Sequence, residues 1–494
     1  MPALFCLGTG GMGGYLMSEN VKVAPVIPLF GRREILTPVE EITRENLPMV
    51  LDDAIAVHSQ NAAAIDYLYW YARGVQPILD RKKSVRPEIN NKVCENHASA
   101  IAQFVASYFL GEPITYTRRG ERAEASKSID VLNDYMYFED KATHDNELAN
   151  WMSICGVGYR MVLPDRLAGK NDDYAPFELD TLDPRNAFVV YHSGFGHRRM
   201  LGVHLVWPPD QPLPVEPYYC GYTETHYFEY RDGAVTVWKP HALNDIPIFE
   251  YRLNPERMGS FEAAIPLLDA INNVSSNRVD GPEQFIQAFL KFKNCDIDEE
   301  DIPKLAKLGA IKIKSTDGMD CDVELISHEL NQSQTQTLVD YLYDQVLVIC
   351  GVPTTKKGGT STSDTGAATY LRDGWAQTEM RARGTEALFK KSEREFLRLV
   401  MRIVKVFTPE FDLKLSEVEC KFTSRQNDNL LTKTQSLLHM LEAGLAPEVA
   451  IATCGLFNDP MDVTAQSAEY LRKWDYVPIE ADTPIVDEHG GEAE

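Results

Sequence analysis

Glycines near the start of the chain are the first pattern that could support chemistry. The stretch Gly8–Gly13 fits G-x-G-x-x-G and follows the apolar Ala3–Leu7, as in the turn that binds the pyrophosphate of a dinucleotide. The helix that this fold requires next is cut short by Pro25 and Pro28, and no βαβ pattern follows. We therefore predict no cofactor and interpret residues 1–45 as a flexible N-terminal arm. A nucleotide- or nucleic-acid-dependent enzyme remains an alternative.

Histidines and aspartates elsewhere could bind a metal or act as acid and base. His192 and His197 are five residues apart, but no cysteine or carboxylate at ligand spacing accompanies them. Asp180 and Asp183 lie before Pro184, where aspartates are common turn residues. The motifs H-E-x-x-H, G-x-S-x-G and G-x-x-x-x-G-K-[ST] are absent from the sequence. We predict no metal site, no catalytic residue and no enzyme activity.

Two lysines in a neutral loop could contact phosphate groups. The loop consists of small polar residues and glycines around them: Thr354, Thr355, Lys356, Lys357, Gly358, Gly359, Thr360, Ser361, Thr362 and Ser363. Lysine contacts to phosphate depend on salt and carry no base information, so a duplex could exchange them as it moves. A loop whose lysines only face solvent is the alternative.

The elements on both sides of this loop are predicted to be helices. Residues 334–350 carry Leu338, Leu342, Val346 and Ile349 at steps of three and four, which is typical of an apolar helical stripe. After the loop, Ser363 or Asp364 could cap a helix that meets no proline before Pro409. Gly374 and Gly384 are the expected bend points of this long helix.

Composition and charge limit the classes of protein. The 494 residues are long enough for several domains, and the net charge of −24 disfavours broad, tight binding to DNA or to an anionic membrane. Nine single cysteines without a C-x-x-C pair indicate reduced thiols. No apolar run reaches the length of a membrane span.

Periodicity along the rest of the chain indicates α+β organisation that is predominantly α. Strands are expected within 156–251, including a hairpin whose turn is Asp232-Gly233. Helices are predicted at 51–71, 91–110, 127–155, 261–277, 430–444 and 447–454. A small module is predicted with strands at 288–293, 310–314 and 322–327 and a helix at 303–308. The acidic residues 476–494 are expected to be disordered.

The order of these parts resembles the portal proteins of tailed bacteriophages of the siphophage type. The stretches that carry the resemblance are Tyr71–Leu79, Asn90–Lys92, Tyr108–Ile114, Ile246–Tyr251, Glu256–Glu262, Leu267–Asn272 and Gly351–Pro353 before the polar loop. The resemblance covers about residues 45 to 475. One departure is Gly281-Pro282, where the family's stem helix usually continues and where a proline should kink or end it.

The resemblance implies a portal fold that assembles as a ring around a central channel. Its parts would be a wing (46–258), a stem helix (259–285), a clip (286–332), a second stem helix (333–351), a tunnel loop (352–363), a long bent helix that returns to the wing (364–428) and a crown (429–475). The stem residues expected to hold the ring together are Leu338, Leu342, Val346, Ile349, Ile265 and Leu268.

The resemblance also implies partners and a location. The partners would be other copies of the chain, twelve in an assembled head, double-stranded DNA in the channel, the major capsid protein, the scaffolding protein, the large terminase subunit and a head-completion adaptor, with no membrane. The location would be the virion, at one capsid vertex, and the host cytoplasm during assembly. A soluble scaffold protein unrelated to phages is the remaining alternative.

Overall fold

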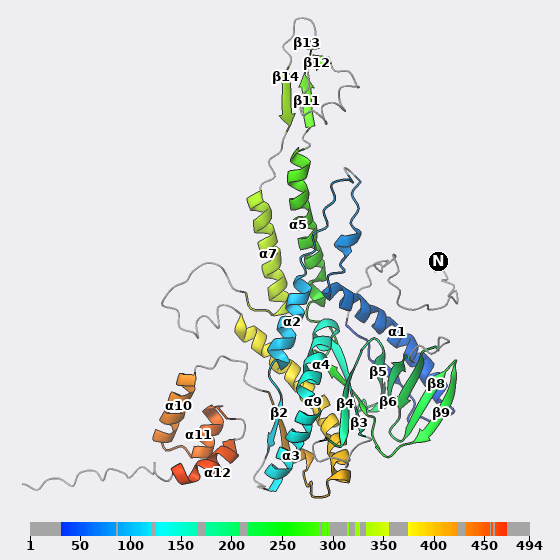
Figure 1. Cartoon of the computed structure of the whole chain (residues 1–494), viewed down its shortest axis with the longest axis vertical. Coiled ribbons are helices and arrows are strands. Elements are labelled where there is room, and N and C mark those ends of the chain that lie inside the picture. The colour runs from blue at the N-terminus through cyan, green and yellow to red at the C-terminus, as the bar shows by residue number, and fades with distance from the viewer. Residues whose placement is uncertain are drawn as a thin grey trace, which may run out of the picture. The chain divides into compact units, whose positions relative to one another are not determined.

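The chain folds into two units of mixed helices and strands, shown by a computed structural model (Figure 1). The first unit contains residues 1–111, 143–166 and 177–403, and the second contains 112–142, 167–176 and 404–494. The structure describes residues 31–84, 87–119, 124–165, 174–207, 216–286, 289–293, 295–296, 314–315, 322–326, 332–354, 374–422, 430–454, 456–457 and 460–471. The predicted α+β class is confirmed.

A six-stranded sheet in the first unit has the order β1-β5-β6-β7-β8-β9. Its strands are β1 (Ile35–Thr37), β5 (Ala187–His192), β6 (Arg199–Val206), β7 (Tyr218–Tyr222), β8 (His226–Arg231) and β9 (Ala234–Pro240). Helix α1 (Leu47–Ala72) contributes Leu47 and Leu51 to the apolar core that covers Phe188 and Phe228. The predicted hairpin is confirmed, because Asp232 and Gly233 have φ angles of +49° and +78°, as a type I′ turn requires.

The N-terminal arm is a partial error of the sequence analysis. Residues 31–45 belong to the fold, because β1 pairs in parallel with β5 and buries Ile35. Arg32 is also buried and forms an ion pair with Glu262 at 2.6 Å. A three-residue strand has too little periodicity to be recognised in the sequence. Residues 1–30, with the glycine motif, lie outside the described residues.

A second sheet of the first unit has the order β10-β3-β4 and packs against the long helix. Its strands are β3 (Val157–Pro164), β4 (Phe177–Leu182) and β10 (Ile248–Arg252). Helix α9 (Trp375–Phe407) places Phe389 at 4.7 Å from Tyr251 and Phe396 at 5.9 Å from Phe249, measured between ring centroids. Aromatic side chains therefore join α9 to β10.

Two helices that pack along each other, α5 (Ile265–Ile286) and α7 (Gln332–Cys350), correspond to the predicted stem (Figure 1). The chain between them includes the antiparallel pairs β11 (Phe289–Lys293) with β14 (Asp322–Ile326) and β12 (Cys295–Asp296) with β13 (Lys314–Ser315). Of the two effects expected of Pro282, a kink or an end of the first helix, the end does not occur, because α5 continues to Ile286. A proline removes one hydrogen bond, and the remaining bonds of a 22-residue helix maintain it.

The second unit joins distant segments through a short sheet. Strand β2 (Thr115–Arg118) pairs antiparallel with β15 (Val418–Lys421). Helix α3 (Glu124–Phe138) packs on β2, where Asn133 binds both the amide and the carbonyl of Tyr116. The remaining described helices are α10 (Leu430–Glu442), α11 (Pro447–Cys454) and α12 (Pro460–Leu471).

Several predicted helix boundaries need correction. The helix expected at 127–155 is two helices, α3 and α4 (Lys141–Cys155), separated at Asp140, whose φ is +46°. Helix α2 (His97–Leu110) begins later than expected, because the Asn96 side chain accepts the amide hydrogen of Ser99 and caps it. Gly374, an expected bend point, has a φ of +83° and precedes α9. The predicted helix at 303–308 and the tail 476–494 lie outside the described residues.

Candidate functional site

The predicted stem residues divide into two groups in the structure. Ile265, Leu268 and Val346 are buried in the core of this chain, with 8%, 1% and 0% of their surface exposed. Leu342 is half-buried against the same core. The three buried side chains therefore pack within the core of the chain itself, and the role of the predicted set in subunit contacts stays a prediction. Only Leu338 and Ile349 of the predicted set are exposed.

An apolar surface remains on the outside of α7. It consists of Leu338, Tyr341, Val348 and Ile349, which we call the outer α7 face and which are 47%, 60%, 49% and 39% exposed. Leu338, Tyr341 and Val348 follow each other at intervals of three and seven residues, so they share one side of the helix. Tyr341 and Val348 are not among the predicted stem residues, although their spacing is visible in the sequence.

The two helices beside the predicted tunnel loop are fastened to each other. Gly351 has a φ of +70°, and the amide groups of Gly351 and Val352 donate to the carbonyls of Val348 and Leu347, which is a Schellman cap. From α9, the Thr378 hydroxyl donates to the Gly351 carbonyl at 2.7 Å. Thr354 is the last described residue of the loop, and 355–363 lie outside the described residues.

The guanidinium of Arg381 strengthens this junction. It donates to the carbonyl of Ile349 at 2.8 Å, close to the negative end of the α7 dipole. Its side chain also lies where a Cβ on Gly351 would stand. A residue other than glycine at position 351 would therefore displace Arg381 and strain the backbone.

One side of α5 is polar and is held by a segment from far earlier in the chain. We call the described part of residues 71–96 the brace segment. Four α5 side chains at helical spacing bind it: Asp269, Asn272, Ser276 and Asp280. The Tyr71 hydroxyl donates to Asp269 at 2.9 Å, and the amides of Glu95 and Val93 donate to Asn272 at 2.8 Å and to Ser276 at 3.0 Å.

Asp280 is the most heavily bonded member of this interface. It is 1% exposed, accepts from the amide of Asn91 at 2.8 Å and from Lys83 at 2.8 Å, and forms an ion pair with Arg81 at 3.2 Å. Burial raises the pKa of its carboxyl, but the hydrogen bonds from Lys83 and Asn91 outweigh burial, so the pKa lies below its usual value. The brace segment is thus attached to α5 by a charged anchor.

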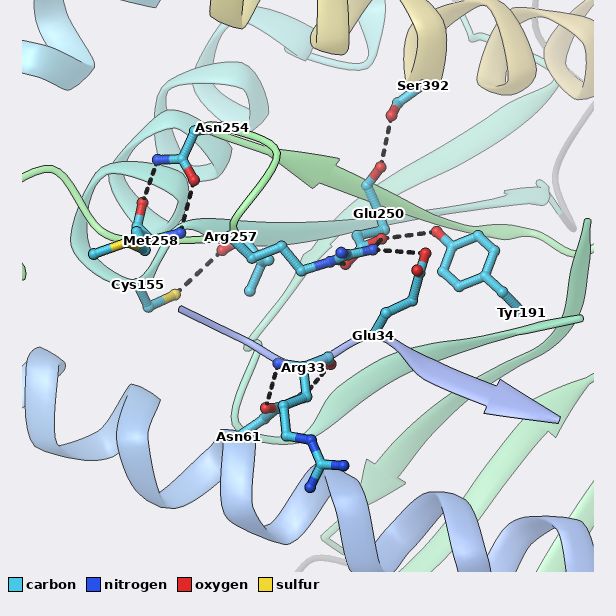
Figure 2. A network of polar contacts seen from close by, with 11 residues as sticks. Arg33, Glu34, Asn61, Cys155, Tyr191, Glu250, Asn254, Arg257, Met258 and Ser392 are labelled. Carbon is cyan, nitrogen blue, oxygen red and sulfur yellow. Dashed lines mark hydrogen bonds and ion pairs between the residues drawn. The ribbon is translucent and has the colours of Figure 1, made fainter. Parts of the chain in front are cut away.

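A second polar network lies between the N-terminal segment, the two sheets and α9 (Figure 2). The Arg257 guanidinium donates to Glu250 at 2.8 Å and to Glu34 at 3.0 Å. The Tyr191 hydroxyl donates to Glu250 at 2.8 Å, and the Ser392 hydroxyl donates to the Glu250 carbonyl at 2.7 Å. Burial, and secondly the Glu250 carboxylate, raise the pKa of Tyr191 well above its usual range.

A third network is fully buried beneath α9. Arg160 forms ion pairs with Asp145 and, at 3.6 Å, with Glu393 of α9, and neither Arg160 nor Glu393 is exposed. The Tyr251 hydroxyl donates to Glu393 at 2.6 Å. Each charge here has an opposite charge beside it. The ion pair between Arg160 of β3 and Glu393 of α9 joins the helix to the sheet.

Two of the residues considered for chemistry, His192 and Asp183, have structural contacts. The ring nitrogen Nδ1 of His192 accepts from the amide of Gly194, and Asp183 binds Arg185 at 2.6 Å. Within the described ranges, no group of three or more His, Cys, Asp or Glu side chains is arranged to hold a metal ion. No helix in the described part of the chain is long and apolar enough to cross a membrane.

A family model and a curated relative both point to portal proteins. The family model "Phage portal protein, SPP1 Gp6-like" matches residues 51–473. The portal protein of Bacillus phage SPP1 is 22% identical over 451 residues, which are 86% of this chain and 83% of that protein. A solved structure, the neck of an empty GTA particle computed with C6 symmetry, has a TM-score of 0.40 and 14% identity over 73% of this chain and 90% of the other. Because the family model spans most of its length, the chain belongs to the SPP1 Gp6-like family of phage portal proteins.

Proposed function

We propose that copies of this chain assemble into a ring at one capsid vertex, and that double-stranded DNA is packaged and ejected through the channel of this ring. Membership of the portal family supports a structural role rather than an enzymatic one. The location would be the virion, after assembly in the host cytoplasm. Twelve copies are the expected number in an assembled head.

The outer α7 face is the observation that carries the proposal. Full burial of one large apolar side chain is worth about 1.5–3 kcal/mol, and within the described chain these four residues remain exposed. In a ring, the same contact repeats at every joint between identical copies. The outer α7 face of one copy would pack against the next copy, while Ile265, Leu268 and Val346 hold each helix pair together.

The loop 354–363 would meet the DNA in the channel. Lys356 and Lys357 supply positive charge in a chain whose net charge is −24, so phosphate would be attracted at the loop and repelled by the average surface. The contacts between α7 and α9 at Gly351 support this role, because they fix the two helices that flank the loop. Glycines within the loop would let it follow a moving duplex.

The module between the two stem helices, residues 286–332, would dock protein partners. We assign to it the large terminase subunit during packaging and the head-completion adaptor afterwards. The major capsid protein and the scaffolding protein would contact other surfaces of the ring. Deletion of residues 296–308 should leave rings intact but abolish terminase capture in a pull-down. Capture by the deleted chain would assign terminase binding to another surface.

Electron microscopy of the purified chain tests the central proposal. Rings with a central hole are expected, with a mass of a whole number of copies by mass photometry. Isolated single copies at micromolar concentration would contradict the ring. Isolated copies that also show the absorbance of a bound nucleotide would favour the enzyme alternative.

A further inference from the structure

A polar cavity of about 560 Å³ lies beside α9 in the first unit, and its lining includes Glu34, Tyr191, Glu250, Arg257 and Ser392 of the network in Figure 2. Its lining includes seven Lys and Arg side chains and five Asp and Glu side chains, so its formal charge is +2 when histidine is neutral. The chain as a whole carries −24. The cavity is therefore positively charged in a protein that is negatively charged overall.

Most of the five carboxylates of the cavity are already paired. Two arginines bind four of them: Arg257 binds Glu34 and Glu250, and Arg199 binds Asp245 at 2.8 Å and Glu395 at 3.1 Å. Glu224 is the fifth carboxylate and is exposed. The other five cations of the lining therefore outnumber the carboxylates left to balance them.

These five cations are Arg198, Arg252, Lys391, Arg398 and Arg402. Arg198 and Arg402 donate to main-chain carbonyls, which do not neutralise a charge. No ion pair joins Arg252, Lys391 or Arg398 to a carboxylate of the described residues. Lys391 and Arg398 are seven residues apart on α9, so they project from one side of that helix into the lining.

The chemistry of the cavity favours a carboxylate-bearing ligand. Its two paired arginines already bind carboxylates, with which guanidinium groups form strong charge-assisted hydrogen bonds. A DNA duplex is too wide for a cavity of this volume. Its phosphates would also face Glu224 and the four paired carboxylates of the lining. A single acidic peptide is narrower than a duplex, and a few of its carboxylates at a time would pair with the five cations.

The chain itself contains such a peptide. Residues 476–494 carry six Asp and Glu residues and no Lys or Arg. We propose that the α9 cavity binds the acidic C-terminal segment of a second copy of this chain, and that this contact adds to the proposed ring. Nineteen residues can span up to about 60 Å when extended.

A binding experiment tests the cavity. The receptor is a full-length chain in which the six Asp and Glu side chains of residues 476–494 are replaced by amides. This receptor carries Glu480→Gln, Asp482→Asn, Asp487→Asn, Glu488→Gln, Glu492→Gln and Glu494→Gln. A fluorescent peptide of residues 476–494 should bind it saturably, more weakly at high salt, and addition of Arg398→Glu should weaken binding by about tenfold or more. Arg394→Glu is the matched control, because Arg394 is exposed on the same helix but does not line the cavity.

Several results would overturn the proposal. Absence of saturable binding, equal weakening by Arg394→Glu and Arg398→Glu, or equal binding of a peptide without carboxylates would each exclude a specific acidic ligand. A short DNA duplex that binds this receptor more tightly than the peptide, and loses binding with Arg398→Glu but not Arg394→Glu, would assign the cavity to nucleic acid.

The source of the segment is tested in a mixture of isotopically light and heavy full-length chains. Carbodiimide coupling should join Lys391 to carboxylates of residues 476–494, with pairs of mixed isotope composition. Pairs of one isotope composition only would overturn the assignment to a second copy. Ring formation is scored separately by mass photometry: loss of peptide binding with intact rings rejects the cavity proposal alone, whereas absence of rings from the unmodified chain rejects the proposed function.

Discussion

Lys83 and Asp280 are separated by 197 positions in the sequence, and their side chains form an ion pair of 2.8 Å. This contact joins the brace segment to α5 about six residues before the end of that helix. Asn91 and Arg81 bind the same carboxylate, so the brace segment is fixed at one point by charge.

The first prediction concerns this anchor. Asp280→Ala should remove the counter-charge of Lys83 and Arg81 and the acceptor of the Asn91 amide, at a cost of about 1–3 kcal/mol. Hydrogen exchange of residues 77–93 should become faster. Asn273→Ala is the control on the same helix, since the Asn273 side chain is exposed and, among the described residues, bonds only to the carbonyl of Asp269. Equal exchange in the two variants would show that Asp280 does not anchor the brace segment.

The second prediction concerns the buried network under α9. Glu393→Ala should lower the free energy of unfolding by about 3 kcal/mol, because Arg160 then lacks one of its two buried counter-charges. Arg394→Ala changes the neighbouring exposed residue and should alter stability by about 0.5 kcal/mol or less. Denaturant titration of both variants measures the difference, and similar values would contradict the assigned role of Glu393.

The third prediction is a pH dependence from His58 of α1. Its ring is buried, stacks on Phe188 and donates to the carbonyl of Arg185, and burial lowers its pKa from 6.5 to about 4. The unfolded chain therefore binds this proton more readily, and stability is lost as the pH falls from about 6.5 towards 4. Between pH 7 and pH 5 the loss from this residue is about 2 kcal/mol.

His58→Gln tests this dependence. Between pH 7 and pH 5, the loss in the free energy of unfolding should be about 2 kcal/mol smaller in His58→Gln than in the parent chain. This difference does not depend on the stability of the variant at pH 7. His439→Gln replaces an exposed histidine and should keep the dependence of the parent chain. An unchanged pH dependence in His58→Gln would show that His58 is protonated in the folded chain at pH 5.

The fourth prediction concerns the outer α7 face. Tyr341→Asp should give smaller species in analytical ultracentrifugation, because a charge would replace an exposed ring at the proposed joint. Leu342→Asp should also reduce assembly, but it disturbs the core of the chain itself and is less informative. Asp344→Asn, on the same helix and exposed, is the control. Unchanged rings with Tyr341→Asp would remove the outer α7 face from the interface.

The fifth prediction concerns the loop lysines. Lys356→Ala with Lys357→Ala should leave ring assembly normal and reduce the length of packaged DNA or its retention in the head, because two phosphate contacts per copy are lost. Packaged length and retention are measured in heads assembled with the double variant at low and moderate salt. Values equal to the parent at both salt concentrations would show that these lysines do not contact DNA.

Local patterns in the sequence determined much of the secondary structure. The apolar period predicted α1, α5 and α7, and Asp232-Gly233 predicted the hairpin of β8 and β9, because helical stripes and tight turns depend on neighbouring residues. The order of the parts also indicated the family. Boundaries were less well predicted at Asp140, where a single residue of positive φ divides one apparent helix into two.

The tertiary structure alone decided which residues of each element are buried within the chain and which remain exposed. The stripe on α7 contained Val346, which the chain buries itself, and omitted Tyr341, which it leaves exposed. Likewise, the sequence shows Asp280 and Lys83 only as charges in distant segments. Periodicity depends on residues a few positions apart, whereas burial and ion pairing depend on which distant segments meet, and the local pattern does not contain that information.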